Sequence, residues 1–291
     1  MHARTTWIRQ HRLVAFFVLA YTLSWWPWPL YAAGVAPAPF LEIGPLLAAL
    51  IVIGLADGLA GLRELGSRIL RWRVRWYWYG VALGFPLVIR AVAAAMNVGF
   101  GAPVPVLGQL AWSSFLMVFA IRVINPMEVP MAEEPGWRGF ALPALQANRS
   151  PLTATLILGV LASGWHLPLV FVGVLGPIGL VGTVAVTFVY TWLFNHTDGS
   201  VLMTLLFHAV EGSISFGDLG FVGADATRME YLYTFTLVLA AVALVAFDRN
   251  AWRRAPAAAV LERLRHDPVA AGTPVPPRTV QLGASSSRTI A

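Results

Sequence analysis

Long apolar stretches, separated by short polar segments, run along the chain as far as about residue 247. A membrane-spanning helix needs about 20 mostly apolar residues. The stretches near that length are residues 13–33, 39–58, 77–97, 109–127, 151–172, 178–195, 201–217 and 230–247. The pattern predicts an all-α, polytopic integral membrane protein with about eight transmembrane helices packed as a bundle.

The composition divides the chain into three parts. Residues 1–12 are polar and basic, residues 13–247 carry the apolar stretches, and residues 248–291 are rich in Ala, Pro, Arg and Ser. We expect a cytosolic N-terminal segment, a membrane domain and a cytosolic, largely disordered tail, because the last part has few large apolar side chains. The basic start resembles a signal peptide, but the apolar stretch after it is long enough to be a retained span.

The positions of the arginines predict the orientation. They gather before the first apolar stretch, after the second at residues 63–75, after the fourth, and in the tail. The segments near 34–38, 98–108 and 173–177 have none. Basic loops remain on the cytoplasmic side of a membrane, so we expect both termini in the cytoplasm.

Composition narrows the candidate chemistry. The net charge of +6 could suggest a nucleic-acid partner. The positive-inside rule already explains where the arginines fall, so no nucleic-acid binding is expected. The absence of cysteine excludes disulfides and thiolate chemistry. Any chemistry must therefore come from Glu, His, Asn or Ser.

The segment MAEEPGWRGFALPALQ, residues 131–146, places charge among apolar stretches, where charge is costly. Residues four apart share one face of a helix, so Glu134 can pair with Arg138 while Glu133 faces elsewhere and stays free. Proline is best tolerated in the first turn of a helix, so we expect the helix to begin near Glu134–Pro135, with a bend there if helical turns precede it. Taken alone, the segment could equally be a charged helix start at the membrane edge.

Two histidines lie inside apolar stretches, His166 in LASGWHLPLV and His208 in LMTLLFHAV. Each by itself could be a core residue that hydrogen-bonds to a neighbouring helix. Polar groups at this depth avoid the acyl chains by facing the bundle interior, so we expect both to converge with Glu133. A carboxylate and two imidazoles around one water provide a general base, a proton shuttle and an oxyanion donor, the groups that hydrolysis requires.

Through these residues the chain resembles the CPBP intramembrane proteases, a family that includes the Rce1-type CAAX prenyl endopeptidases and bacterial abortive-infection relatives. The first family motif, EExxxR, is matched by Glu133, Glu134 and Arg138. The second, FxxxH, is matched at His166, although Ala162 stands at the Phe position. The third, HxxxN or HxxxD, is matched at His208, although Gly212 stands at the Asn position.

The resemblance implies a conical bundle and a glutamate-dependent endopeptidase in the inner membrane of a bacterium. It also implies that Glu133 and His166 activate water and that His208 stabilises the oxyanion. The supporting positions are Glu134, Arg138, Trp165 and Gly212.

The two departures from the family motifs differ in their expected effect on activity. Ala162 in place of Phe is expected to widen the pocket, because the lost side chain packs and does no proton chemistry. Loss of the amide at Gly212 removes an oxyanion donor, which typically costs about 10²–10³ in turnover. Glu211 cannot replace the amide unless it is protonated, whereas Ser213 or a water could. Weakened or lost activity therefore stays open.

The leading interpretation is a peptidase without cofactor or metal that cuts a peptide or lipidated protein near its membrane anchor, with CAAX-type processing as a narrower form. The alternative is a catalytically weak or inactive relative that binds a membrane peptide as an immunity or assembly factor. A third interpretation is a zinc peptidase with Glu133, His166 and His208 as ligands, although HExxH is absent. A transporter has no support, because no interrupted spans recur in matching halves.

Two further arginines lie within apolar stretches. Arg90 and Arg122, in the third and fourth stretches, could each line a cavity or extend to the membrane interface. The pattern makes no prediction about the oligomeric state.

Overall fold

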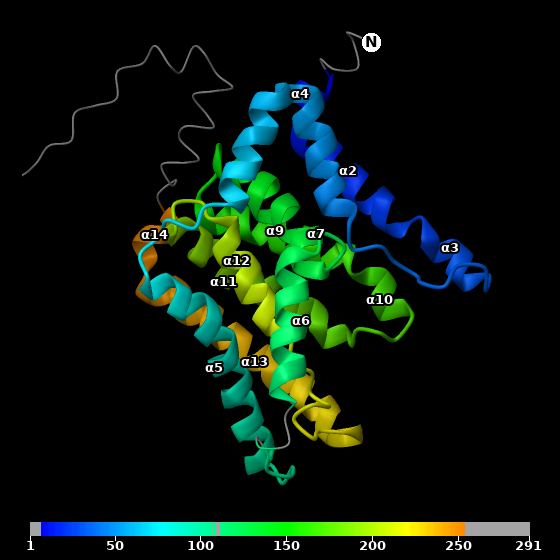
Figure 1. Ribbon diagram of the computed structural model, residues 1–291, viewed down its shortest axis with the longest axis vertical. Helices are drawn as coiled ribbons and strands as arrows, with labels where there is room; N and C mark the ends of the chain where they lie inside the picture. The colour runs from blue at the N-terminus through cyan, green and yellow to red at the C-terminus, as the bar shows by residue number, and fades with distance from the viewer. Residues whose placement is uncertain (1–6, 107, 109–110, 254–291) are drawn as a thin grey trace, which may run out of the picture.

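A computed structural model describes residues 7–106, 108 and 111–253, and every regular element in this part of the chain is a helix (Figure 1). A π-helical turn, η2, joins α7 to α8. The prediction of an all-α protein is therefore confirmed. In chain order the elements are α2 (Arg12–Trp25), α3 (Pro27–Ala32), α4 (Gly44–Ile69), α5 (Tyr77–Gly99), α6 (Trp112–Ile124), α7 (Val129–Gly136), η2 (Trp137–Ala141), α8 (Leu142–Gln146), α9 (Pro151–Trp165), α10 (Leu167–Phe171), α11 (Pro177–His196), α12 (Val201–Glu211), α13 (Gly223–Phe247) and α14 (Arg249–Arg253).

Six segments of the described chain are long and apolar enough to cross a membrane, and the chain is a polytopic membrane protein. The other two predicted stretches contain the shorter helices α9 and α12, of 15 and 11 residues. Helix α9 ends at Trp165 because Pro168 cannot continue it. The predicted count of eight is therefore not confirmed for the described residues. The six segments are Arg12–Ala32, Gly44–Ile69, Tyr77–Gly99, Trp112–Gln146, Pro177–His196 and Gly223–Phe247.

Helix α4 turns back on itself at Gly58 (Figure 1). The backbone there has φ 63° and ψ −150°, a conformation that is open essentially to glycine alone. Asp57 beside the bend forms an ion pair with Arg12 of α2, with 2.6 Å between Nη2 and Oδ1. The second arm of α4 returns Arg68 to the centre of the molecule, where Nη1 donates to the Gly139 carbonyl at 2.8 Å.

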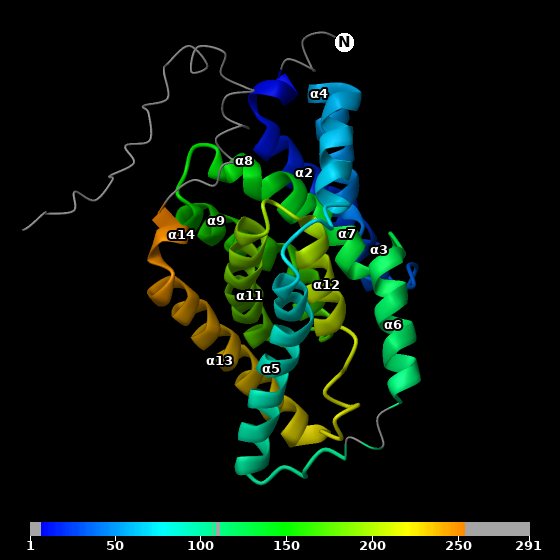
Figure 2. The same ribbon diagram turned by 60° about the vertical axis from the view of Figure 1, so that its left-hand side comes forward.

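Two hydrophobic cores flank the middle of the molecule. The first joins α2, α4, η2, α8 and α9 through residues such as Phe16, Trp137 and Trp165. The second joins α5, α11, α12 and α13 through residues such as Val189 and Phe207. Figure 2 shows α11 and α12 in the interior, with α13 on one side and α6 on the other. Helix α12 also contacts α7, so the two cores meet along these helices.

The predicted tail begins with a helix. Trp252 of α14 is buried, its ring lies 5.5 Å from that of Phe188, and its Nε1 donates to the Leu244 carbonyl at 3.0 Å. Residues 254–291, the rest of the predicted tail, lie outside the described residues.

Candidate active site

The EEPGWR segment lies inside a helix and does not begin one. Helix α7 begins at Val129, with Pro130 in its first turn, so the predicted start near Glu134–Pro135 is wrong. Pro130 takes the place that favours proline, while Pro135 falls in the helix interior. Since Pro135 has no N–H to donate, it interrupts the regular hydrogen bonding. The π-helical turn η2 follows directly, a local form that is frequent at functional sites.

Two glycines let α4 approach this segment closely. A methyl group built at Gly136 would lie 2.6 Å from the carbonyl carbon of Pro45, and one at Gly139 would lie 2.5 Å from Cδ1 of Leu65. Small residues allow helices to come together in this way in membrane proteins. Gly136 and Gly139 have two residues between them, one fewer than in the GxxxG pattern of paired membrane helices, so that pattern could not have predicted this packing.

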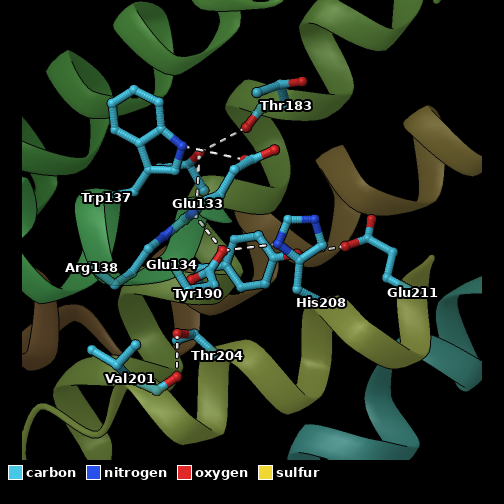
Figure 3. A network of polar contacts seen from close by, with 11 residues as sticks. Glu133, Glu134, Trp137, Arg138, Thr183, Tyr190, Val201, Thr204, His208 and Glu211 are labelled. Atoms are coloured by element: carbon cyan, nitrogen blue, oxygen red, sulfur yellow. Dashed lines mark hydrogen bonds and ion pairs between the residues drawn. The ribbon is translucent and has the colours of Figure 1, made fainter. Parts of the chain in front are cut away.

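Glu134 forms the centre of a buried polar network (Figure 3). Its side chain is completely buried, and Oε1 accepts from Nη1 of Arg138 at 2.9 Å and from Nδ1 of His208 at 3.0 Å. The predicted pairing of Glu134 with Arg138 is thus present. Arg138 is held further by Thr187 and Tyr190 of α11, with Cζ 4.1 Å from the centre of the tyrosine ring. The network joins α7, η2, α11 and α12.

Glu133 has a different environment. Its Oε2 accepts from Nε1 of Trp137 at 3.2 Å, and no cation among the described residues forms an ion pair with it. The side chain is 5% exposed and lines a cavity. Figure 3 shows its carboxylate pointing away from that of Glu134, as expected for neighbours on a helix. The Glu134 carboxylate is therefore held by charged and polar side chains of the protein, whereas the Glu133 carboxylate is available to a molecule in the cavity.

The two histidines each use one ring nitrogen for the protein. Nδ1 of His166 lies 2.8 Å from the carbonyl of Ala162, which can only accept, so Nδ1 carries a proton, and no described residue hydrogen-bonds to Nε2. Nδ1 of His208 donates to Glu134 at 3.0 Å, so Nε2 of this ring is also free. Both rings keep one nitrogen for a ligand.

The three residues proposed to be catalytic line one cavity of about 460 Å³, which lies between the two cores. It brings together Glu133 from α7, His166 from the end of α9 and His208 from α12. A larger cavity of about 830 Å³ lies between α9, α11, α13 and α14, has mainly apolar walls, and contains none of these three.

The predicted supporting residues fall into two groups. Arg138 and Gly212 line the cavity, and so does Ala162 at the Phe position. Trp165 is fully buried beside it, and its ring lies 4.9 Å from that of His166 and perpendicular to it. Glu134 is likewise buried and contacts the cavity residues Arg138 and His208. These two therefore orient the residues that line the cavity.

Besides Glu133, the cavity wall contains the carboxylates of Glu211 and Glu230, and the sequence had suggested Glu211 only as an unsuitable replacement for the missing amide. Glu211 lines the cavity and accepts hydrogen bonds from the hydroxyl groups of Tyr190 and Tyr233, each at 2.7 Å. Arg90 donates from Nη2 to the backbone carbonyl of Glu211. A glutamate inside an apolar stretch was the available signal, because charge at this depth needs partners. Nothing in the sequence identifies those partners.

The zinc interpretation requires three ligands around one point. Within the described part of the chain, no three His, Asp, Glu or Cys side chains are arranged to hold a metal ion. His208 already donates to Glu134. We therefore derive no step through a metal.

Comparison with known proteins matches the region that carries the site. Residues 111–213 match the family model described as type II CAAX prenyl endopeptidase, Rce1-like. A stretch of 130 residues is 26% identical to CAAX prenyl protease 2 of Methanococcus maripaludis and covers 40% of this chain and 46% of that protein. The region 111–213 includes all three motifs, from Glu133 to Gly212. Through this region, the chain is similar to the Rce1-like family, and it spans less than half the length of the archaeal relative.

Proposed function

We propose that the chain is an intramembrane endopeptidase that hydrolyses a peptide bond near a membrane anchor, with Glu133 as the general base. One observation carries the proposal. Glu133, His166 and His208 come from three different helices and line a single cavity between two apolar cores. Charged and polar groups at such depth usually serve a function, because their burial is costly.

The proposed reaction is the addition of water to the peptide carbonyl. Glu133 takes one proton from water as the water oxygen bonds to the carbonyl carbon, and the carbonyl electrons move onto the carbonyl oxygen. Nε2 of His166 accepts a hydrogen bond from the same water and orients it. The oxyanion then collapses, the C–N bond breaks, and the leaving nitrogen takes the proton from Glu133. The products are an amine and a carboxylic acid, which then releases its proton to the solvent or to the amine.

His208 is proposed to donate to the oxyanion from Nε2. The bond between its Nδ1 and Glu134 fixes the ring, and the carboxylate balances the charge when both ring nitrogens carry protons. Arg138 holds Glu134 from the other side at 2.9 Å. In this arrangement Glu134 and Arg138 position His208 and do not touch the substrate.

The proposed substrate class is a peptide or lipidated protein whose scissile bond lies next to a membrane anchor. The name of the archaeal relative, CAAX prenyl protease 2, supports a prenylated CAAX sequence as the first probe. The cavity is compatible with such a chain, because apolar residues of α11 and α13, such as Val186 and Leu237, line it beside the polar groups.

The test uses a fluorogenic farnesylated CAAX peptide, with the same peptide lacking the farnesyl group as a comparison. We expect the full-length protein in detergent micelles to cleave the farnesylated peptide and Glu133→Gln to lose the activity. If the wild type binds both peptides but cuts neither, the peptidase proposal fails and a non-catalytic peptide-binding protein becomes the better description. Equal cleavage by wild type and variant would remove Glu133 from the mechanism.

We further propose that both termini face the cytoplasm, that residues 13–247 form the membrane domain, and that the membrane is the bacterial inner membrane. A hydrogen bond from Ser200 to the backbone of Arg71 supports the orientation, since it joins the turn after α11 to the arginine-rich segment 63–75, which is predicted to be cytosolic. The chain has no cysteine, so single exposed cysteines report the side directly. In intact cells, a membrane-impermeant maleimide should label Val104→Cys and not Ser67→Cys, and the reverse pattern would contradict the orientation.

A further inference from the structure

Two arginines from different helices converge on the C-terminal end of α12. Arg90 comes from α5 and Arg122 from α6, and they reach Glu211 and Gly212 respectively. Both lie in membrane-spanning segments, where an unpaired charge is costly. The contacts that each arginine makes differ, and so do the roles that these contacts indicate.

Arg90 is held by one backbone carbonyl and two aromatic rings. Its Nη2 donates to the carbonyl of Glu211, and Cζ lies 5.2 Å from the ring centres of both Phe216 and Tyr233. A cation held by a helix carbonyl and two aromatic rings has a structural role.

Arg122 has no such partners. No hydrogen bond, ion pair or ring contact joins its guanidinium to any other described residue, and Nε is fully buried. The guanidinium lies against Gly212, a residue of the cavity wall. A methyl group built at Gly212 would lie 2.9 Å from Cζ of Arg122. The guanidinium therefore fills the space into which any side chain at residue 212 would extend.

We propose that Arg122 is a catalytic residue whose guanidinium donates to the oxyanion together with His208. Gly212 stands four residues after His208, where the third motif has an amide, and the Arg122 side chain occupies the place of that amide. A guanidinium offers five N–H donors and a permanent positive charge, so it can replace an amide as an oxyanion donor. The proposal rests on the proposed peptidase function.

A purely structural role for Arg122 makes a different prediction. A cation near the C-terminal end of a helix stabilises the helix dipole, so its loss would lower thermal stability and leave turnover per folded molecule unchanged. An oxyanion donor acts mainly in the transition state, so its loss lowers kcat more than it changes KM. A binding site for a substrate carboxylate would instead raise KM.

The first experiment measures kcat, KM and melting temperature for Arg122→Gln, with Arg149→Gln as the matched control. Arg149 is exposed in the turn before α9 and has no part in the site. Loss of one oxyanion donor predicts a fall in kcat of about 10²–10³-fold for Arg122→Gln and none for Arg149→Gln. A wild-type kcat in Arg122→Gln, or a rise in KM alone, would overturn the proposal. A wild type that cleaves nothing would count against the peptidase function instead.

Binding of a transition-state mimic tests the donor without turnover. The probe is a farnesylated peptide with a phosphinate, a tetrahedral anion, in place of the scissile amide, compared with the amide peptide on Glu133→Gln protein. We expect the phosphinate to bind more tightly than the amide, and Arg122→Gln to remove about 10²–10³-fold of that preference. An unchanged preference, or no preference for the phosphinate at all, would overturn the assignment.

Restoring the amide gives the sharpest control. Gly212→Asn alone should displace the guanidinium, which is the movable end of a long side chain, and put one oxyanion donor in place of the other, so kcat should change by less than about 10-fold. In Arg122→Ala the space is empty, so adding Gly212→Asn should raise kcat by at least about 10-fold over Arg122→Ala. If the double variant is no better than Arg122→Ala, the two side chains do not share a role and the proposal fails.

Discussion

Glu133 and Glu134 are adjacent in the chain and occupy contrasting surroundings. Glu134 is fully buried and accepts hydrogen bonds from Arg138 and His208. Glu133 accepts one from Trp137 and faces the cavity. Both side chains are buried. Burial alone therefore does not show which of the two carboxylates takes part in the reaction. The carboxylate without a cationic partner is the one that can take a proton from water.

The largest expected effect is that of Glu133→Gln on turnover. Loss of a general base typically costs about 10²–10⁴ in rate, and we expect the upper end because the amide cannot accept the proton from water. The melting temperature should be unchanged or higher, because a buried charge with a single hydrogen bond is removed. Peptide cleavage and thermal unfolding of the same preparation measure both. A large loss of stability would place Glu133 with Glu134 as a structural group.

Glu134→Gln is expected to lower stability strongly and turnover less, the reverse of Glu133→Gln. Weakening a buried ion pair leaves Arg138 without its counter-charge, and breaking such a pair costs about 3–5 kcal/mol of stability. Turnover should fall by about 10–100-fold, as when other residues that orient a histidine are changed. A melting temperature equal to that of the wild type would show that Arg138 does not depend on this carboxylate.

Trp137→Phe is expected to have a smaller effect on both measurements. The change removes the one indole donor to Glu133 and keeps most of the ring that packs against Phe16 and Trp165. We expect a loss of about 1 kcal/mol in stability, the usual net value of one hydrogen bond, and a change in kcat of less than about 10-fold. A loss as large as that of Glu133→Gln would mean that the indole itself takes part in catalysis.

The smallest expected effect is that of a chelator. Incubation with EDTA, followed by dilution into the cleavage assay, should leave turnover unchanged. In the proposed mechanism Glu133 takes a proton from water and does not bind a metal ion. The control is a zinc peptidase treated in the same way. Loss of turnover on EDTA treatment and its recovery with zinc would favour the two-histidine, one-carboxylate site.

The sequence predicted those features that depend on local spacing. The apolar stretches marked the helices, and the four-residue spacing placed Glu134 opposite Arg138 on one helix face. Two histidines in separate stretches were expected to converge with Glu133, and all three line one cavity. Each of these inferences follows from helix geometry or from the cost of polar groups in lipid.

The remaining features depend on contacts between distant segments. Spacing could not show that Pro130 would open the helix and leave Pro135 inside it. Nor could it show that Tyr190 and Tyr233 would hold Glu211, since these residues lie 21 and 22 positions away from it. Such contacts arise when helices pack, and several packings would satisfy the same apolar pattern.

The measurement that tests the central claim most directly is the ratio of kcat for Glu133→Gln to kcat for Glu134→Gln. Both variants are assayed on the farnesylated peptide and normalised to folded protein. If Glu133 is the base and Glu134 only orients His208, Glu133→Gln should be slower than Glu134→Gln by at least about 100-fold. Equal rates, or a slower Glu134→Gln, would contradict the division of roles between the two carboxylates.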